Sequence, residues 1–262
     1  MKFNNTNVLL GSNVRLGKNV RIGDNTTIYD NVTIGDNTVI SSNCLIGEPV
    51  NSYYHETTYN NPELTIGANS IIRSNTIIYA GTAIGEGLQT GHFSIIRENN
   101  VLGDHCCVGV YCHIMDRCKI GNYVRFHSYD SIGELSEIGD FVQFYPCVTT
   151  TNCPAPPSDI LLGCKFGEYS IIAANAFFLP GSEIGRHCFV GSQSSVKGIF
   201  EDFSFISGNP AKRLMDVRKA PIINAITHKR QYPWPYNFTR NMPWEEIGYE
   251  QWLNLNTEKN EE

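Results

Sequence analysis

An apolar residue recurs at every sixth position through most of this chain, and this period constrains the fold more than any other feature. The positions run from 10 to 46, from 66 to 150 and from 166 to 196. Of these 28 positions, 26 are aliphatic or Phe, and 16 are followed directly by Gly. An α-helix repeats every 3.6 residues and a strand every 2, so neither produces a period of six. A triangular β-solenoid does, with one inward residue on each short side and Gly where the chain turns.

Two segments interrupt the period, and a segment of different composition follows it. The interruptions cover about 47–65 and 152–165, and prolines in the second cannot donate to a β ladder. Both are expected to be loops extruded from the solenoid, where binding residues tend to lie. We therefore divide the chain into a β-helix domain at 1–213 and a C-terminal segment at 214–262. In that segment we expect a helix from Leu214 to about Lys229, followed by an aromatic tail that docks on the solenoid or on a neighbouring subunit.

Charge, hydropathy and cysteine usage exclude several classes of function. The net charge is −6 with scattered Lys and Arg, so no nucleic-acid partner is expected. The first residues lack the apolar stretch of a signal peptide, and no apolar run reaches 18 residues, which predicts a cytoplasmic protein without membrane association. Six of the nine cysteines occupy the second inward position of a repeat, two residues before a core residue, and are read as small core residues. These are Cys44, Cys106, Cys112, Cys118, Cys164 and Cys188. No C-x-x-C pair occurs, so we expect no metal site and a reducing compartment.

Four polar residues spaced by 18 form the most informative set. Three six-residue sides make one coil, so residues 18 apart are expected to stack at about 4.8 Å. Glu98, Asp116, Glu134 and Asn152 have this spacing, and the last directly precedes the second loop. Three of the four do not follow Gly and are therefore not ordinary turn residues. Stacked carboxylates are expected to raise the pKa of at least one of them, as in a proton acceptor or a site for a cationic amine.

Two histidines are candidate general bases. His113 precedes a core Ile, and His127 takes a position that Gly holds in other repeats. Imidazole titrates near neutrality, so either residue could accept a proton. The spacing of the histidines does not fit a metal site on a solenoid. Tyr145, together with Glu98, is a candidate for contact with the substrate.

Several strings near the end of the repeats resemble a known family. Ala173-Ala174-Asn175-Ala176, Gly191-Ser192-Gln193-Ser194 and Gly208-Asn209-Pro210-Ala211-Lys212-Arg213 are similar to the closing coils of hexapeptide-repeat acyltransferases. The resemblance covers about residues 5–213. Thr151-Asn152 before a proline-bearing loop resembles the branch that acylates amino groups on nucleotide-linked deoxysugars.

The resemblance implies a fold, a co-substrate and an assembly. The fold is an all-β solenoid, a left-handed parallel β-helix of hexapeptide repeats with extruded loops and a short, partly helical C-terminal tail. The co-substrate is acyl-CoA, with acetyl-CoA as the default, and the assembly is a homotrimer with active sites between neighbouring subunits. Ala174, Ser192 and Lys197 match positions that contact the pantetheine and nucleotide of coenzyme A, and Lys212 and Arg213 are available for phosphate charge. Gly-Ser-Gln-Ser replaces the family's usual Gly-Ala-Gly-Ser, which leaves the backbone fit at Gln193 open.

The resemblance implies N-acylation of a dTDP-linked 3- or 4-amino-dideoxyhexose, for surface polysaccharide or glycan biosynthesis. The amine attacks the thioester directly, Asn152 orients the amine or stabilises the oxyanion, and Glu134 with Asp116 holds the ammonium group and draws off its proton. One alternative is O-acylation of a sugar or serine hydroxyl with His113 or His127 as base. Others are a non-catalytic scaffold and a carbonic-anhydrase-like variant of the same fold, which needs three zinc-binding histidines.

Overall fold

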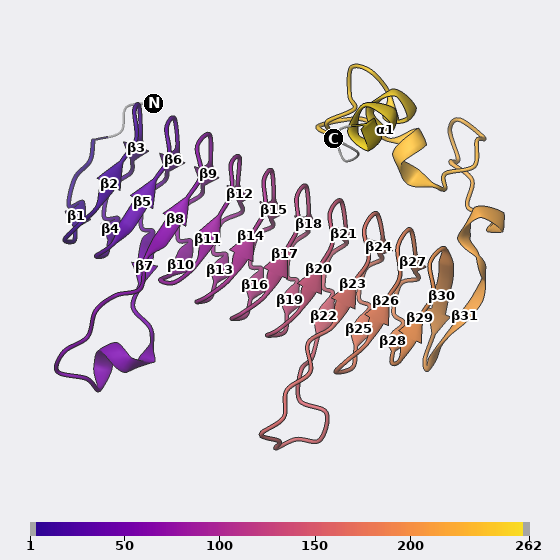
Figure 1. The fold of residues 1–262 in the computed structure, drawn as a ribbon, viewed down its shortest axis with the longest axis horizontal. Helices are drawn as coiled ribbons and strands as arrows, with labels where there is room; N and C mark the ends of the chain where they lie inside the picture. The colour runs from indigo at the N-terminus through magenta and orange to yellow at the C-terminus, as the bar shows by residue number, and fades with distance from the viewer. Residues whose placement is uncertain (1–3, 259–262) are drawn as a thin grey trace.

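The computed structural model describes residues 4–258, which coil into a long triangular prism with the C-terminal segment folded back beside it (Figure 1). Three sheets of ten, ten and eleven strands run the length of the prism. Every third strand belongs to the same sheet, so one coil contains one strand from each sheet. This all-β solenoid is a left-handed parallel β-helix, and it confirms the fold expected from the six-residue period.

The three sheets are named A, B and C in the order in which the chain visits them. Sheet A contains β1 (Leu9–Leu10), β4 (Thr27–Ile28), β7 (Leu45–Glu48), β10 (Ile77–Tyr79), β13 (Ile95–Ile96), β16 (His113–Ile114), β19 (Ser131–Ile132), β22 (Thr149–Thr150), β25 (Phe177–Phe178) and β28 (Ser195–Val196). Sheet B contains β2 (Arg15–Leu16), β5 (Val32–Ile34), β8 (Leu64–Ile66), β11 (Ala83–Ile84), β14 (Val101–Leu102), β17 (Lys119–Ile120), β20 (Glu137–Ile138), β23 (Lys165–Phe166), β26 (Glu183–Ile184) and β29 (Ile199–Phe200). Sheet C contains β3 (Arg21–Ile22), β6 (Val39–Ile40), β9 (Ile71–Ile72), β12 (Gln89–Thr90), β15 (Cys107–Val108), β18 (Arg125–Phe126), β21 (Gln143–Phe144), β24 (Ile171–Ile172), β27 (Phe189–Val190), β30 (Ser204–Gly208) and the antiparallel β31 (Ala211–Asp216).

The core lies inside the prism and is built from the periodic residues. Ile96, Ile114 and Ile132 are fully buried and stack in register, each 18 residues from the next. The six cysteines assigned to the second inward position are also buried, at most 1% exposed. Both the 18-residue stacking and the role of these cysteines as core residues are therefore confirmed.

The turns between sheets form three corners, named A–B, B–C and C–A after the sheets that they join. The third residue after a core residue has positive φ in most turns, a conformation that Asn tolerates better than bulky residues. In the first coils this residue is Asn, and the side-chain amides of successive coils hydrogen-bond, as between Asn13 and Asn31 at 3.0 Å. Aromatic rings and histidines replace Asn in later coils at the B–C and C–A corners.

The C-terminal tail packs on the chain's own solenoid. Trp234, Trp244 and Tyr249 are buried against Phe141 and Tyr169, which lie at the B–C corner. The indole of Trp234 donates to the carbonyl of Tyr169 at 2.7 Å. The tail was expected to dock either on the solenoid or on a neighbouring subunit, and the structure shows it on the solenoid. The 3₁₀ turn Val217–Lys219 leads from β31 into the tail, and a second 3₁₀ turn, Trp234–Asn237, lies within the tail.

The expectation of a helix from Leu214 to about Lys229 is wrong. Residues up to Asp216 belong to β31, which pairs antiparallel with β30 and so satisfies the exposed edge of sheet C. Pro221 lies just beyond the 3₁₀ turn Val217–Lys219 and removes a donor that a helix needs. The only α-helix within residues 4–258 is α1, Tyr249–Glu258, and no helix in this part is long and apolar enough to cross a membrane.

Candidate functional site

Both extruded loops leave the β-helix at the A–B corner. The first connects β7 to β8 and contains the 3₁₀ turn Asn51–Tyr54; the second connects β22 to β23. β7 and β22 belong to the same sheet, so the two loops project from the same edge of the prism, as Figure 1 shows. They are five strands apart in sheet A, which corresponds to about 24 Å. The corner between them is framed by the two loops.

The four 18-spaced residues stand on this framed corner. Glu98, Asp116, Glu134 and Asn152 each follow a sheet A strand by two residues, and those strands are hydrogen-bonded neighbours. The carboxylate side chains are 15%, 16% and 12% exposed. We call these four residues the acidic column.

Two arginines from the same turns neutralise part of the acidic column. Arg97 binds both carboxylate oxygens of Glu98, at 2.6 and 2.7 Å. Arg117 donates to Asp116 at 2.9 Å and also to Glu134 on the next coil. Two guanidinium groups face three carboxylates, so one negative charge is left over.

The pairing lowers the pKa of Glu98, whereas a raised pKa was expected for at least one carboxylate of the column. Burial raises the pKa of Glu98, but hydrogen bonds from Arg97 and the positive charges of Arg97 and Arg117 outweigh burial and hold the pKa below its ordinary value. The sequence-based expectation considered repulsion between carboxylates and missed both arginines. Arg97-Glu98 and Asp116-Arg117 are adjacent in sequence, and this adjacency was the available signal.

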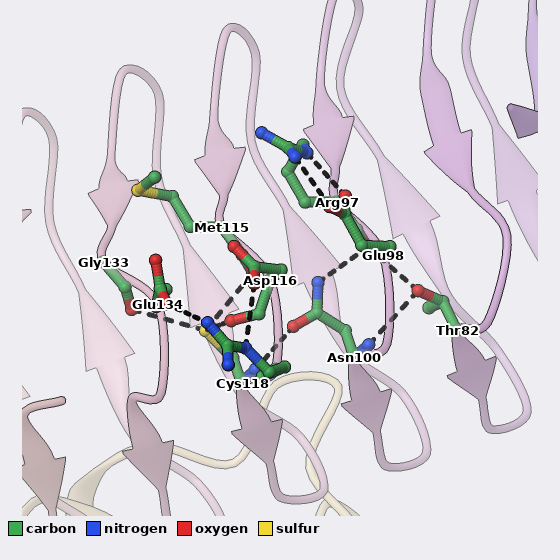
Figure 2. A network of polar contacts seen from close by, with 10 residues as sticks. Thr82, Arg97, Glu98, Asn100, Met115, Asp116, Cys118, Gly133 and Glu134 are labelled. Atoms are coloured by element: carbon green, nitrogen blue, oxygen red, sulfur yellow. Dashed lines mark hydrogen bonds and ion pairs between the residues drawn. The ribbon is translucent and has the colours of Figure 1, made fainter. Parts of the chain in front are cut away.

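A layer of buried polar side chains fixes the backbone beneath the acidic column (Figure 2). Asn100 is fully buried, its amide donates to the carbonyl of Arg97 at 2.8 Å, and its oxygen accepts the N–H of Cys118 at 2.7 Å. Thr82 donates to the same Arg97 carbonyl at 2.9 Å. These bonds hold the turns rigid, so the carboxylates are presented from a preorganised backbone.

Asn152 lies where the acidic column meets the second loop. Its carbonyl accepts the N–H of Leu162 at 2.7 Å, which closes the base of the loop. No hydrogen bond engages its side-chain amide within residues 4–258, and the residue is partly exposed. The amide is therefore available to a bound molecule. Ile160 and Leu162 on the same loop are 67% and 45% exposed.

The structure separates the two candidate histidines. His113 lies on the outer face of sheet A in β16, three residues before Asp116, and burial together with the charge of Arg97 lowers its pKa. His127 lies at the C–A corner, stacked on Tyr145 with ring centroids 5.0 Å apart, and burial together with Arg125 lowers its pKa. Both imidazoles are neutral at neutral pH, but only His113 is on the strand that leads to the acidic column.

The candidate coenzyme-binding residues lie at several places. Ala174 and Ser192 are both at the C–A corner, one coil apart. Lys197 follows β28 at the A–B corner, and Lys212 lies on β31. Arg213 is engaged within the chain, because its Nε lies 3.0 Å from Glu201 and 3.1 Å from Ser204. Within residues 4–258 no group of three or more His, Cys, Asp or Glu side chains is arranged to hold a metal ion.

Comparison with known proteins agrees with the coil geometry. A family model described as bacterial transferase hexapeptide (six repeats) matches residues 7–48. These residues form the first coils, with the same inward spacing as all later ones. The match therefore shows that these first coils are built from hexapeptide repeats of the kind found in bacterial transferases.

Curated relatives of this hexapeptide-repeat protein share part of its length. The bifunctional protein GlmU of Alkaliphilus metalliredigens is 25% identical over 158 residues, which is 59% of this chain and 32% of the relative. GlmU of Alkaliphilus oremlandii is 34% identical over 94 residues, which is 34% of this chain and 20% of the relative. The chain thus spans a third or less of the curated relatives that it matches.

Solved structures that align with the chain include two named acyltransferases. The UDP-N-acetylglucosamine acyltransferase from Campylobacter jejuni has a TM-score of 0.48 and 13% identity, covering 81% of this chain and 75% of that one. A mutant of AntD, an N-acyltransferase from Bacillus cereus in complex with dTDP and coenzyme A, has a TM-score of 0.32 and 17% identity, covering 78% and 84%.

Proposed function

We propose that this hexapeptide-repeat protein is an acyl-CoA-dependent N-acyltransferase, with acetyl as the default acyl group. Its acceptor is the amino group of a dTDP-linked 3- or 4-amino-dideoxyhexose, used for surface polysaccharide or glycan biosynthesis. The observation that carries the proposal is the acidic column: three carboxylates, two arginines and a free amide at the corner between two loops. The uncompensated negative charge favours a cationic ammonium group over a neutral hydroxyl.

The chemistry is direct transfer within a ternary complex. Glu134, with Asp116, holds the substrate ammonium group and accepts one proton from it. The free amine then attacks the thioester carbonyl and the C–N bond forms. The C–S bond breaks to release the thiolate of coenzyme A, which takes up the proton that the acylated nitrogen loses. The side-chain amide of Asn152 donates to the oxyanion, a contribution of about 3 kcal/mol by comparison with other oxyanion donors. Most of the remaining rate enhancement comes from holding two reactants in the correct orientation.

The resemblance of the closing coils supports a site for the co-substrate along them. Ala174 and Ser192 are small residues at one corner and allow close approach of the pantetheine arm. Lys197 and Lys212 supply positive charge for phosphates, with a smaller share from Arg213 because Glu201 already pairs with it. In this proposal the reaction requires no metal. All nine cysteines are free, which fits a reducing compartment such as the cytoplasm.

A homotrimer with parallel prisms is part of the proposal. A threefold axis along the prism brings the same residue of three chains to one level. Lys119 and Glu137 on the outer face of sheet B would then meet like charges, whereas Ile95, Ser131 and Thr149 on the outer face of sheet A would not. Sheet A is therefore the face expected nearest the axis, with the acidic column at its edge. Sedimentation equilibrium would report a single species of three chains; a monomer would contradict this part.

O-acylation is the second candidate, and the position of His113 favours it. This imidazole is neutral, half-buried and on the strand that leads to Asp116, as a general base for a hydroxyl requires. His127 lies at the opposite edge of sheet A and fits this role less well. If His113 is the base, His113→Gln abolishes turnover; if the acceptor is an amine, activity falls only modestly.

The test is release of the coenzyme A thiol from acetyl-CoA with matched acceptors. The panel contains dTDP-linked 3-amino and 4-amino dideoxyhexoses and the corresponding hydroxyl sugars. We expect thiol release with an amino sugar and none above background with the hydroxyl sugars. Release with the hydroxyl sugars alone would establish the second candidate, and no release with any acceptor would contradict acyl transfer.

A further inference from the structure

A ladder of exposed aromatic rings runs along the C–A corner. Phe93, Tyr111 and Tyr129 stack on successive coils, with ring centroids 4.9 and 5.4 Å apart and interplanar angles of 6° and 10°. Their exposed fractions are 45%, 49% and 58%. The next coil has Cys147 at this place, so the ladder ends at Tyr129, and no ring within residues 4–258 stacks on the outer face of the Tyr129 ring.

The residues of the ladder adopt an unfavourable backbone conformation. Phe93, Tyr111 and Tyr129 have φ of +58°, +56° and +66°, a region that disfavours residues with a bulky side chain. Earlier coils have Asn25, Asn43 and Asn75 at the same place in the turn. At the B–C corner the same replacement is explained, because the tail buries the rings there. Within residues 4–258 no segment covers the ladder at the C–A corner.

Charge distinguishes this corner from the A–B corner. From residue 41 to residue 193, the three-residue turns that follow the sheet C strands contain no Asp or Glu. The acidic column carries excess negative charge and repels phosphate groups. A molecule with a cationic amine at one end and a nucleoside diphosphate at the other therefore fits with its amine at the A–B corner and its nucleotide at the C–A corner.

The distance across sheet A suits such a molecule. Tyr129, Ser131 and Glu134 belong to one coil, so five residues separate the end of the ladder from the acidic column, at most about 17 Å of extended chain. The outward side chain between them, Ser131, and its neighbour Thr149 on the next coil are small, so they leave room for such a molecule between sheet A and a neighbouring prism of the proposed trimer.

We propose that the free face of Tyr129 binds the planar base of a nucleotide, which continues the ladder as its next ring. This inference rests on the proposed function for the identity of the ligand. The base belongs to the nucleotide-linked sugar or to coenzyme A, since both contain a planar base next to phosphates. Stacking on an aromatic ring is tolerant of base identity because every base has a π face.

The test measures binding without turnover, by isothermal titration of dTDP and, separately, of coenzyme A. Stacking of one base is worth about 1–3 kcal/mol, so Tyr129→Ala is expected to weaken binding of one ligand by roughly 5- to 150-fold. Tyr129→Phe keeps the ring and restores affinity, and also controls for folding. Phe93→Ala is the matched control, because it removes an exposed ring of the same ladder at the far end.

The two ligands distinguish the sources of the base, since loss with dTDP assigns the sugar nucleotide and loss with coenzyme A assigns adenine. Unchanged affinity of Tyr129→Ala for both ligands would overturn the inference even if the protein acylates an amino sugar. Conversely, Tyr129-dependent dTDP binding without acyl transfer to any acceptor would leave the inference standing and refute the proposed function.

Discussion

Arg117 and Glu134 form an ion pair between successive coils of the β-helix. The same guanidinium binds Asp116 on its own coil, so Arg117 lies between the two carboxylates that the proposed mechanism assigns to the substrate ammonium group. The Arg117 side chain is 50% exposed and long enough to move aside. The guanidinium group of Arg117 thus occupies the place where the proposed mechanism requires the ammonium group of the substrate.

Removal of this internal competitor is expected to tighten binding of the amine. In Arg117→Gln both carboxylates lose their partner, so the KM for the amino sugar should fall by about two- to fivefold, the effect of one exposed ion pair. Steady-state kinetics at low and high salt would measure it. Lys119→Gln, an exposed charge on sheet B, is the control and should leave KM unchanged. A rise in KM for Arg117→Gln would mean that the arginine holds the carboxylates in place for the substrate.

Asp130 makes the protein less stable at high pH. This carboxylate occupies an inward position, is 1% exposed and accepts the N–H of Val148 at 2.8 Å, while Oδ2 has no partner within residues 4–258. Burial raises its pKa to about 7, so the folded state favours the protonated form, and the stability this form contributes is lost as pH rises through 7.

We expect Asp130→Asn to raise the free energy of unfolding at pH 8 by about 3 kcal/mol, with a much smaller gain at pH 4.5. Urea denaturation at both pH values would show the difference. Asp159→Asn, on the exposed second loop, is the control. Equal gains at the two pH values would mean that ionisation of Asp130 is not the cause.

His187 makes the protein less stable at low pH, which is the opposite of the effect of Asp130. Its ring is stacked between Tyr169 and Phe203, at 4.7 and 4.9 Å, and burial, followed by the charge of Arg186, lowers its pKa to about 4. The folded state favours the neutral ring, so the contribution to stability is present above the unfolded pKa of about 6.5 and is lost as pH falls toward 4. Between pH 7 and 4.5, the wild-type protein should lose roughly 2 kcal/mol more than His187→Phe. Parallel losses in both proteins would exclude this residue as the source.

Trp244 is the most deeply buried of the tail's rings that pack on the β-helix. Trp244 is fully buried, contacts the rings of Phe141 and Trp252, and donates to the carbonyl of Phe238 at 2.9 Å. Trp244→Ala is expected to cost about 3–5 kcal/mol in this cluster, enough to release the tail while the coils stay folded. Limited proteolysis should then cut beyond residue 220 with the β-sheet circular dichroism unchanged. Loss of that signal would show that the tail and the β-helix fold together.

The period of six predicted the sheets, the core and the neighbours of each coil, because backbone geometry alone decides which side chain points inward. It therefore placed Glu98, Asp116 and Glu134 at one corner before the structure was known. Side-chain reach does not follow a period, so the bridge that Arg117 makes between coils was not predicted.

The structure that follows the last repeat could not be predicted from the sequence either. Whether Leu214 begins a helix or continues a strand depends on the free edge of β30, which attracts β31 through backbone groups that no side-chain pattern reveals. The separation of His113 from His127 follows from the coil register, but their neutral state depends on burial and on Arg97 and Arg125.

The most direct test of the account is the division between KM and kcat in Glu134→Gln, assayed with acetyl-CoA and the preferred amino sugar. Glu134 is assigned mainly to binding of the ammonium group, so KM should rise about tenfold, the value of one charge-assisted bond, while kcat falls much less. Glu137→Gln, on the neighbouring sheet of the same coil, should match the wild-type protein. Loss of turnover with an unchanged KM would contradict the account, because Glu134 would then act on the transition state alone.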